Sequence, residues 1–261
     1  MINNLIRKAK KAPWVLGQKL TQTPSNPHAV ISDLFVWRCD QDWNTYFELL
    51  DLVSLFGERG QHQVAVVFFD DEGGQFYRQP VDLIGLHRQV LDVSKILSAL
   101  ECLPSNYGTF CVFHQQSPSE VLNSEVFLTE RGYISYQYKN APLRSYVHGN
   151  LDAIDDSLTP LSGSSLLNRT YNLQYLLEPG KQYEVVLTNA SGSDKKVVFK
   201  IISFDRKTHM NRRITLKSKQ AFVLPVKGLP GSSRLIIKSK MIMARPAVFC
   251  FDGGNMDVSH G

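Results

Sequence analysis

The chain has 261 residues, of which 43% are hydrophobic and 20% are charged, proportions that are typical of a globular protein. No apolar run approaches the roughly 20 residues that a membrane-spanning helix needs. The four cysteines show no CxxC spacing, which fits a reducing compartment better than a disulfide framework, so we expect a cytoplasmic protein.

The net charge of +5 is concentrated at the beginning of the chain. Residues 1 to 32 contain five basic residues and no acidic one, whereas basic and acidic residues balance in the remainder. Residues 2 to 16 place apolar side chains at helical spacing with basic ones opposite, which predicts an amphipathic helix that binds an anionic inner membrane face. The alternatives are a helix docked on the protein body and a frayed end. The membrane-binding candidates are Arg7, Lys8, Lys10, Lys11 and Trp14.

Residues 1 to 27 comprise this helix and a linker with two prolines, and residues 28 to 150 are predicted to form a first β-sandwich domain. Strand-like runs alternate there with turn residues, and the Asp and Gly cluster at 70–74 predicts a hairpin. One helical turn is expected over residues 94–100. The predicted strands cover residues 29–38, 46–53, 63–69, 75–81, 83–93, 107–114 and 126–138. Periodicity alone also allows a short helix over residues 46–53, and the match with the second half favours a strand there.

The composition changes over residues 151 to 168, where acids, Ser, Thr, Pro and Gly replace aromatic and branched residues, so we predict an interdomain linker. Residues 169 to 261 again show short apolar runs between Gly, Pro and Asn turns, which predicts a second β-sandwich domain. The expected strands there cover residues 171–177, 183–188, 196–204, 213–217, 221–226, 233–239 and 246–251.

The two predicted domains resemble each other in sequence, which indicates an internal duplication. Residues 131–150, RGYISYQYKNAPLRSYVHGN, and residues 245–261, RPAVFCFDGGNMDVSHG, share an initial Arg, a helix breaker, an apolar run, a polar turn and a closing His-Gly. Four earlier segments match in the same order: YFELLDL with YEVVLT, QVAVVFFDDEG with KVVFKIISFDR, RQVLDVSKIL with QAFVLPVKGL, and GTFCVFH with SRLIIKS. The sequence therefore predicts an all-β fold of two tandem antiparallel sandwiches with a short N-terminal amphipathic helix.

The order of strands and turns from residue 196 to residue 251, above all SRLIIKSKMIMARPAVFCF, resembles the sensory rhodopsin transducer family. The resemblance is one of strand pattern, includes no catalytic motif, and implies a small β-sandwich with a fold like that of carbohydrate-binding modules. The duplication, the basic leader and the His-Gly endings depart from that family, so we carry over no rhodopsin partner.

His148 and His260 occupy equivalent positions, each followed by a glycine. One interpretation is a ligand site, built by each histidine separately or by both facing each other between the domains, with Asp152, Asp252 or Asp257 as partners. The other is that each histidine caps its final strand while the glycine takes a positive φ.

The other candidates are arginines and tyrosines of the repeated segment. Arg131 and Arg245 would either bind an anionic group or seal a sandwich end through backbone carbonyls. Tyr133, Tyr136, Tyr138 and Tyr146 would form either a sugar-stacking surface or ordinary core and edge packing. The ligand-binding candidates are His148, Arg131, Tyr136, Tyr138, Tyr146, Asn150, His260 and Arg245.

The sequence lacks the motifs of a nucleophile elbow, a phosphate loop, a dinucleotide site and a zinc site, so we expect no catalytic residues, cofactor or metal. The first hypothesis is a non-catalytic binding or scaffold protein for a saccharide, a glycolipid or a protein. The alternative is an enzyme of glycan or nucleotide-sugar metabolism with His148 as base, assisted by Asp152 or Asp156. Exposed sandwich edges would allow a homo-oligomer, and no nucleic-acid motif is present.

Overall fold

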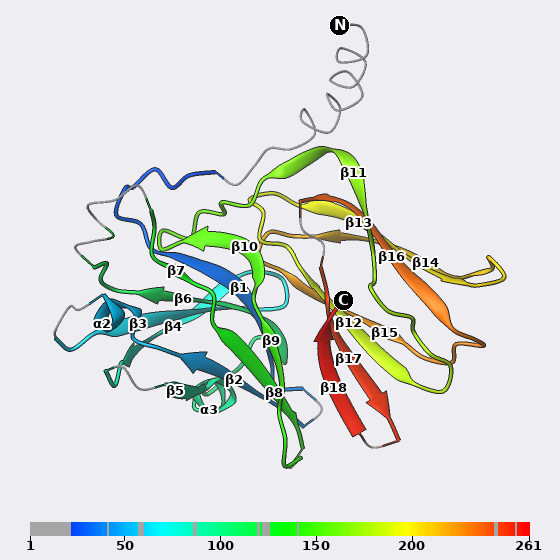
Figure 1. Ribbon diagram of the computed structural model, residues 1–261, viewed down its shortest axis with the longest axis horizontal. Helices are drawn as coiled ribbons and strands as arrows, with labels where there is room; N and C mark the ends of the chain where they lie inside the picture. The colour runs from blue at the N-terminus through cyan, green and yellow to red at the C-terminus, as the bar shows by residue number, and fades with distance from the viewer. Residues whose placement is uncertain are drawn as a thin grey trace, which may run out of the picture.

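The computed structural model describes residues 22–40, 42–56, 60–85, 88–118, 121, 126–139, 141–242, 245–253 and 255–261. The helix predicted over residues 2 to 16, with Arg7, Lys8, Lys10, Lys11 and Trp14, lies outside the described residues. Four β-sheets and two short helices make up the described chain, so the prediction of an all-β fold is confirmed (Figure 1). None of the described helices has the length and apolar composition that crossing a membrane requires.

The first half of the chain forms two sheets. The larger sheet has the order β10-β1-β6-β3-β4, and β7 pairs with β1 in parallel. The smaller sheet has the order β5-β2-β8-β9. The strands of the larger sheet are β1 (Ile31–Arg38), β3 (Gln63–Phe69), β4 (Gln75–Asp82), β6 (Tyr107–His114), β7 (Thr129–Glu130) and β10 (Asn150–Asp155). Those of the smaller sheet are β2 (Trp43–Leu49), β5 (Gln89–Asp92), β8 (Tyr133–Tyr138) and β9 (Ser145–His148).

The second half repeats this topology except for β7 and β10, which have no counterpart there. Its sheets have the orders β11-β16-β13-β14 and β15-β12-β17-β18, which correspond to β1-β6-β3-β4 and β5-β2-β8-β9 when the remaining strands of each half are counted in sequence. The strands are β11 (Ser164–Asn172), β12 (Gln182–Thr188), β13 (Lys195–Ser203), β14 (Thr208–Leu216), β15 (Ala221–Val226), β16 (Ser233–Met241), β17 (Ala247–Asp252) and β18 (Asn255–His260). The order of the matched sequence segments therefore reappears in the strand order.

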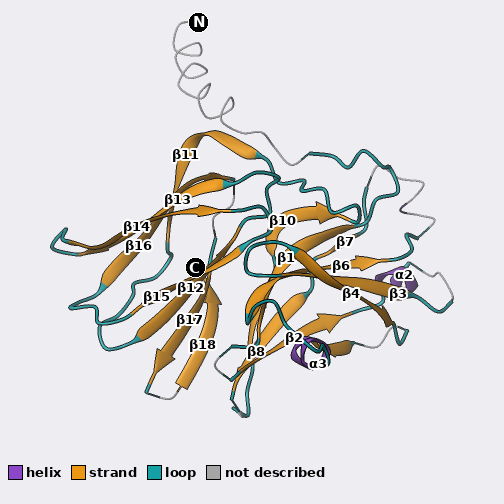
Figure 2. Cartoon of the chain, turned by 180° about the vertical axis from the view of Figure 1, so that it is seen from behind, coloured by secondary structure: helices purple, strands orange, loops and turns teal. Residues whose placement is uncertain are grey.

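The two helices flank β2 and β5. Helix α2 (Leu52–Leu55) follows β2, and its first turn is capped by the Asp51 carboxylate, which accepts the Ser54 backbone N–H at 3.0 Å. Helix α3 (Val93–Ser98) follows β5 and matches the helical turn expected over residues 94–100 (Figure 2). The strand expected over residues 83–93 is shorter than predicted, since only residues 89–92 pair with β2.

Alternating burial shows which side of each sheet faces its partner. In β2 every second residue, from Trp43 to Leu49, is buried, and Phe47 meets Phe35 of β1 edge-on with 4.8 Å between ring centroids. In β13 the buried residues Val197, Phe199 and Ile201 pack on the sheet that contains β12. Each half therefore contains two sheets joined by a common apolar layer.

The largest hydrophobic cluster also takes residues from both halves. Phe249 of β17 is fully buried and lies 4.9 Å from the Trp43 ring and 4.8 Å from the Tyr136 ring, both in the first half. The edge strands β9 and β18 lie side by side (Figure 1). The sheet β15-β12-β17-β18 thus packs on its own half with one face and closes the core of the first half with the other.

Residues 151–168, predicted as a linker, contain strand β10, a tight turn and the start of β11 instead. Strand β10 pairs with β1, and the polar residues that suggested a linker build the turn: Asp155 accepts hydrogen bonds from the Ser157 hydroxyl at 2.6 Å and the Thr159 backbone N–H at 2.8 Å. The composition signalled a turn between strands because Asx-type turns and linkers use the same residue types.

Candidate functional site

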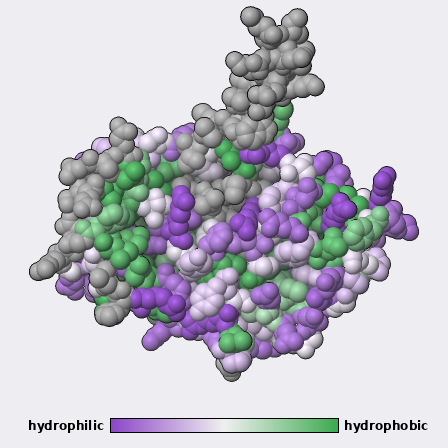
Figure 3. All heavy atoms as spheres, viewed as in Figure 1, coloured by the Kyte–Doolittle hydropathy of each residue, from purple (hydrophilic) through white to green (hydrophobic). Residues whose placement is uncertain are grey.

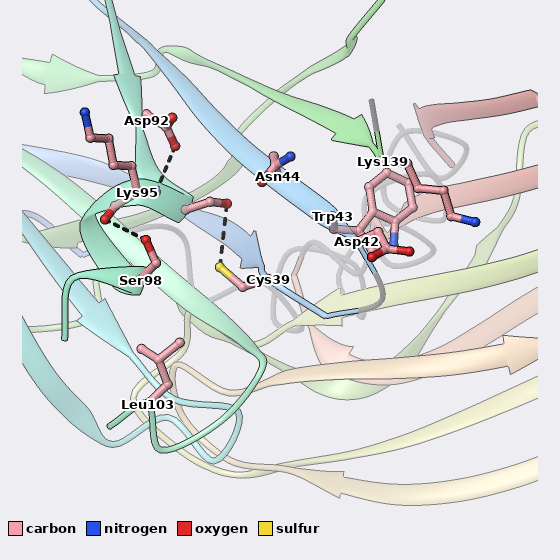
Figure 4. Close-up of a pocket in the computed structure, with 10 residues that line it drawn as sticks. Cys39, Asp42, Trp43, Asn44, Asp92, Lys95, Ser98, Leu103 and Lys139 are labelled. Atoms are coloured by element: carbon pink, nitrogen blue, oxygen red, sulfur yellow. Dashed lines mark hydrogen bonds between the residues drawn. The ribbon is translucent and has the colours of Figure 1, made fainter. Parts of the chain in front are cut away.

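The most polar pocket described has a volume of about 910 Å³ and lies between the start of β2 and helix α3. Figure 4 shows Asp42, Trp43 and Lys139 on one side, the residues of α3 on the other, and Cys39 and Asn44 between them. The lining residues are Cys39, Asp42, Trp43, Asn44, Asp92, Ser94, Lys95, Ser98, Leu103 and Lys139. A pocket of this volume accommodates a small molecule.

Local backbone chemistry positions the α3 side of this pocket. Asp92 is the N-cap of α3 and accepts the Lys95 backbone N–H at 2.8 Å, so the helix begins where the pocket wall begins. The Ser94 hydroxyl accepts the backbone N–H of Thr45 at 2.8 Å and thereby ties α3 to β2. The wall is therefore rigid at its base, while the Lys95 and Ser98 side chains stand at its surface (Figure 4).

Trp43 forms the opposite wall and is only 2% exposed. Its ring is enclosed by Arg38, whose guanidinium lies 5.1 Å from the ring centroid, and by Tyr138 and Phe249 at 5.0 Å and 4.9 Å. The buried indole N–H has no acceptor among the described residues. Because a buried donor without a partner costs stability, this N–H is an unusual feature at the edge of a polar pocket.

The charges that line the pocket balance. Asp42 and Asp92 supply two carboxylates, Lys95 and Lys139 supply two ammonium groups, and Asn44 adds an amide that both donates and accepts. The described residues contain no cluster of His, Cys, Asp and Glu suited to a metal ion. The pocket therefore offers mixed donors and acceptors without net charge, which suits a neutral hydroxylated ligand better than a polyanion.

Cys39 is the one thiol in this pocket. Burial raises the pKa of the Cys39 thiol above its ordinary value, and its hydrogen bond to the Ser94 hydroxyl at 3.6 Å offsets only part of that increase. The thiol is therefore protonated at neutral pH, and a protonated thiol is a weak nucleophile. Cys39 is therefore not an activated nucleophile in this pocket.

His148 and His260, predicted as a facing pair or as separate strand caps, do face each other. Their ring centroids are 4.3 Å apart, and Nε2 of His260 donates a hydrogen bond to the backbone oxygen of His148. His148 Nδ1 donates to the Gly149 carbonyl at 2.9 Å. Both rings therefore donate hydrogen bonds to backbone oxygens, and the bond from His260 joins β18 to β9. These contacts favour a structural role for the two histidines over the role of a catalytic base.

We had expected a positive φ at the glycines that follow the two histidines, but neither glycine has one. They are instead required by the lack of space for a side chain. A Cβ at Gly149 would lie 2.6 Å from Cε1 of Phe35, and one at Gly261 would lie 2.2 Å from Cδ1 of Leu173. Close approach of the chain to the core explains both residues.

His260 makes the stability of this contact depend on pH. The pKa of His260 is lowered from 6.5 to about 4, chiefly by burial and in smaller part by the charges of Arg245 and His148. The unfolded chain therefore binds the proton first as the pH falls, so the stabilisation is complete above pH 6.5 and is lost between pH 6.5 and 4.

We expect His260→Gln to remove about 1–2 kcal/mol of this pH dependence, a figure reduced for the partial exposure of the ring. Urea unfolding of the wild type and the variant at pH 7 and pH 5 measures the difference. Equal losses of stability between these two pH values in both proteins would contradict the assignment.

Arg245 seals the end of its half, the second of the two roles considered for the repeated arginines. Its Nε donates to the Gly261 carbonyl at 3.3 Å, and the Tyr171 hydroxyl donates to the same oxygen. Arg131 is exposed and lines a separate apolar pocket of about 590 Å³ with Leu55, Phe56 and others. Figure 3 shows hydrophobic residues gathered on that side, over β7 and near α2.

Two of the four tyrosines take the packing role that was considered beside the sugar-stacking one. Tyr136 is 1% exposed and donates its hydroxyl proton to the Val36 carbonyl at 2.8 Å, and burial raises its pKa, so its assignment as a ligand-binding residue is wrong. Tyr138 is half-buried against Trp43 and Phe251. Tyr133 and Tyr146 are exposed on β8 and β9. Asn150 is the first residue of β10, beside β1, and its side chain is not described.

The structure brings His148, His260 and Arg245 together but places none of the predicted ligand-binding residues in the polar pocket. The nearest approach is Tyr138, over whose ring the Lys139 ammonium lies at 5.0 Å. The sequence reasoning missed the segment Asp42-Trp43-Asn44, where a tryptophan between two polar residues begins strand β2.

Comparisons with known proteins add no family. No protein-family model matches the chain, and no curated protein matches it. A solved structure of infectious bursal disease virus, Gt strain, shares 12% sequence identity over 90% of this chain, with a TM-score of 0.17, and the chain spans 56% of that chain's length. This likeness carries no argument, and the resemblance to the sensory rhodopsin transducer family stays a prediction.

Proposed function

We propose that the protein is a non-catalytic binding protein whose polar pocket beside Trp43 holds a neutral saccharide. The observation that carries this proposal is the balanced set of two carboxylates, two ammonium groups and one amide around a pocket of about 910 Å³. Each sugar hydroxyl both donates and accepts a hydrogen bond, so it needs partners of both kinds. A ligand hydroxyl that reached the Trp43 indole N–H would also supply the acceptor that this N–H lacks among the described residues.

The proposal predicts that a saccharide raises the melting temperature of the wild type, because a ligand of the folded state alone stabilises it by about 2.7 kcal/mol at a concentration of 100 times Kd. A panel of neutral mono- and oligosaccharides tested by thermal shift identifies the sugar. Titration calorimetry then compares Asn44→Ala and Lys139→Ala with the control Lys227→Ala, whose lysine lies outside this pocket.

We expect each pocket variant to bind at least about tenfold more weakly, since a lost hydrogen bond to a charged or amide group costs about 1.4 kcal/mol or more, and we expect the control to bind as the wild type does. A panel without any stabilising sugar would refute the proposal. So would a sugar that binds all three variants with unchanged affinity.

We also propose that the fold arose by duplication of one β-sandwich domain, with one copy over residues 28–150 and the other over residues 169–261. The equivalent strand orders of the two halves support this. The meeting of His148 with His260 and of β9 with β18 supports it as well, because equivalent edges of the two copies lie together.

Peripheral attachment to an anionic inner membrane face through residues 2 to 16 is part of the same proposal. It is supported by the five basic residues, without any acidic one, among residues 1 to 32.

A further inference from the structure

The charge of the protein is divided between its two halves. Residues 169–261 contain 16 Lys and Arg against 6 Asp and Glu, a net charge of +10, while residues 28–168 contain 8 against 18, a net charge of −10. These two charges cancel in the sum, which is why the chain beyond residue 32 looked neutral by composition. A separation of this size gives one end of the molecule a strongly positive potential.

The positive charge gathers on one sheet face. Strands β11, β13, β14 and β16 contain no aspartate or glutamate. Alternate residues of these strands point away from the apolar layer, and we call their surface the basic face. Its cations are Lys196, Lys200, Arg213, Arg234, Lys238 and Lys240.

The strand register sets these cations close to one another. Lys238 and Arg213 flank Val198 on its two neighbouring strands, so their Cα atoms lie about 10 Å apart across the sheet. None of the ion pairs among the described residues involves a cation of the basic face. Like charges on one sheet face repel each other, so the arrangement destabilises the free protein and favours an anionic partner.

We infer that the basic face binds the surface of a membrane containing anionic lipids. Aliphatic residues, Val198, Ile202 and Ile236, alternate with its cations, and the exposed Leu166 and Leu167 extend from β11 at its edge. Basic residues mixed with aliphatic ones are the composition of surfaces that bind membrane interfaces.

The position of the N-terminal segment agrees with this partner. The Gln22 backbone N–H donates to the Leu161 carbonyl at 2.8 Å, three residues before β11 begins. Gln22 therefore lies near the strand that borders the basic face, and the five basic residues that precede it in the sequence are joined to the protein at this edge.

Two other polyanionic partners fit less well. A single-stranded nucleic acid binds on a series of aromatic side chains that stack with its bases. The residues between the cations of the basic face are aliphatic or small polar ones, and the exposed ring beside a cation of this face is that of Phe204, next to Arg234. A second copy of the chain would have to present an acidic sheet face, but Asp70, Asp71 and Glu72 of the acidic half lie in a turn.

The test is co-sedimentation of the full chain with vesicles of phosphatidylcholine alone or mixed with phosphatidylglycerol. Two variants change the basic face, Lys200→Glu/Lys238→Glu and Lys196→Glu/Lys240→Glu. A control, Arg78→Glu/Lys227→Glu, makes the same charge change at exposed residues elsewhere. We expect the wild type and the control to bind only the anionic vesicles, and the basic-face variants to bind them at least about tenfold more weakly.

Equal binding of anionic vesicles by the control and both basic-face variants overturns the inference. If deletion of residues 1–21 then abolishes binding, the inference is still overturned, but the proposed attachment through the N-terminal segment is supported. Binding of the wild type to neutral vesicles with equal affinity also overturns it. So does a wild type that ignores vesicles but binds single-stranded DNA or associates with itself in sedimentation. Melting temperatures within a few degrees of the wild type establish that each variant is folded. None of these outcomes depends on the saccharide proposal.

Discussion

Replacing Arg38 with methionine is expected to lower the free energy of unfolding by about 3–5 kcal/mol, because it leaves two carboxylates without their cation in a largely buried site. The Arg38 side chain has no exposed surface, and it bonds Asp40 through Nε at 2.8 Å and Glu184 through Nη1 at 2.6 Å. Burial lowers the pKa of Arg38, but the hydrogen bonds to the two carboxylates outweigh it and raise the pKa overall, so the charge is permanent.

The pair with Glu184 joins the two halves of the chain, since Glu184 belongs to β12. Urea unfolding of Arg38→Met, Glu184→Leu and the double variant measures the coupling between the two residues. We expect the double variant to be more stable than Arg38→Met, because removing the stranded carboxylate relieves part of its desolvation cost. Arg78→Met, an exposed change on β4, serves as the control. A loss below about 1 kcal/mol in Arg38→Met would show that the ion pair contributes little.

Truncation of Phe249 to alanine is expected to cost about 3–5 kcal/mol and to destabilise both halves at once. The ring is fully buried, meets Trp43 and Tyr136, and receives the Arg38 guanidinium 4.6 Å from its centroid. A cavity there removes contacts that belong to the core of the first half although the residue is in the second.

Two probes distinguish a shared core from two independent ones. Fluorescence reports chiefly on Trp37 and Trp43 of the first half among the described residues, and circular dichroism reports on all strands. We expect coincident transitions that shift together in Phe249→Ala, as a two-state unit requires. Phe204→Ala, at a residue that is 62% exposed, should change stability by less than about 0.5 kcal/mol. A Phe249→Ala protein in which only the circular dichroism transition moves would contradict the shared core.

The repeat was the most informative sequence feature, because order is conserved even where residues differ. In the segments aligned with β3, β6 and β8, equivalent residues point into a core in both halves. The buried pairs are Val64 and Val197, Phe110 and Leu235, and Ile134 and Val248. The match of Tyr46 with Tyr183 slips by one residue, since Tyr46 is half-exposed and Tyr183 is buried. A shift of one residue in a strand reverses its faces, and short apolar runs do not fix that register.

The polar pocket could not be predicted, because its residues come from four separate segments and share no motif. Asp92 caps a helix of six residues, and Lys139 lies in the turn after β8 with a positive φ of 51°. Only the folded chain brings them near Trp43. The charge separation, by contrast, can be calculated from the sequence. It is not visible in the net charge of residues 28–261, because the charges of the two halves cancel.

Phe249 and Phe251 make the contact between the two halves asymmetric, because the first half has no aromatic residues at the equivalent positions. The aligned segments place Ser135 and Gln137 of the first copy at the positions that these aromatic rings take in the second. The second half thus has an apolar surface that the first half lacks, and this surface is buried against the first half. A contact of this head-to-tail kind would build an open filament if every copy offered both sides of it. Because the first half has polar residues at these positions and the second half has aromatic ones, only the second half offers this contact.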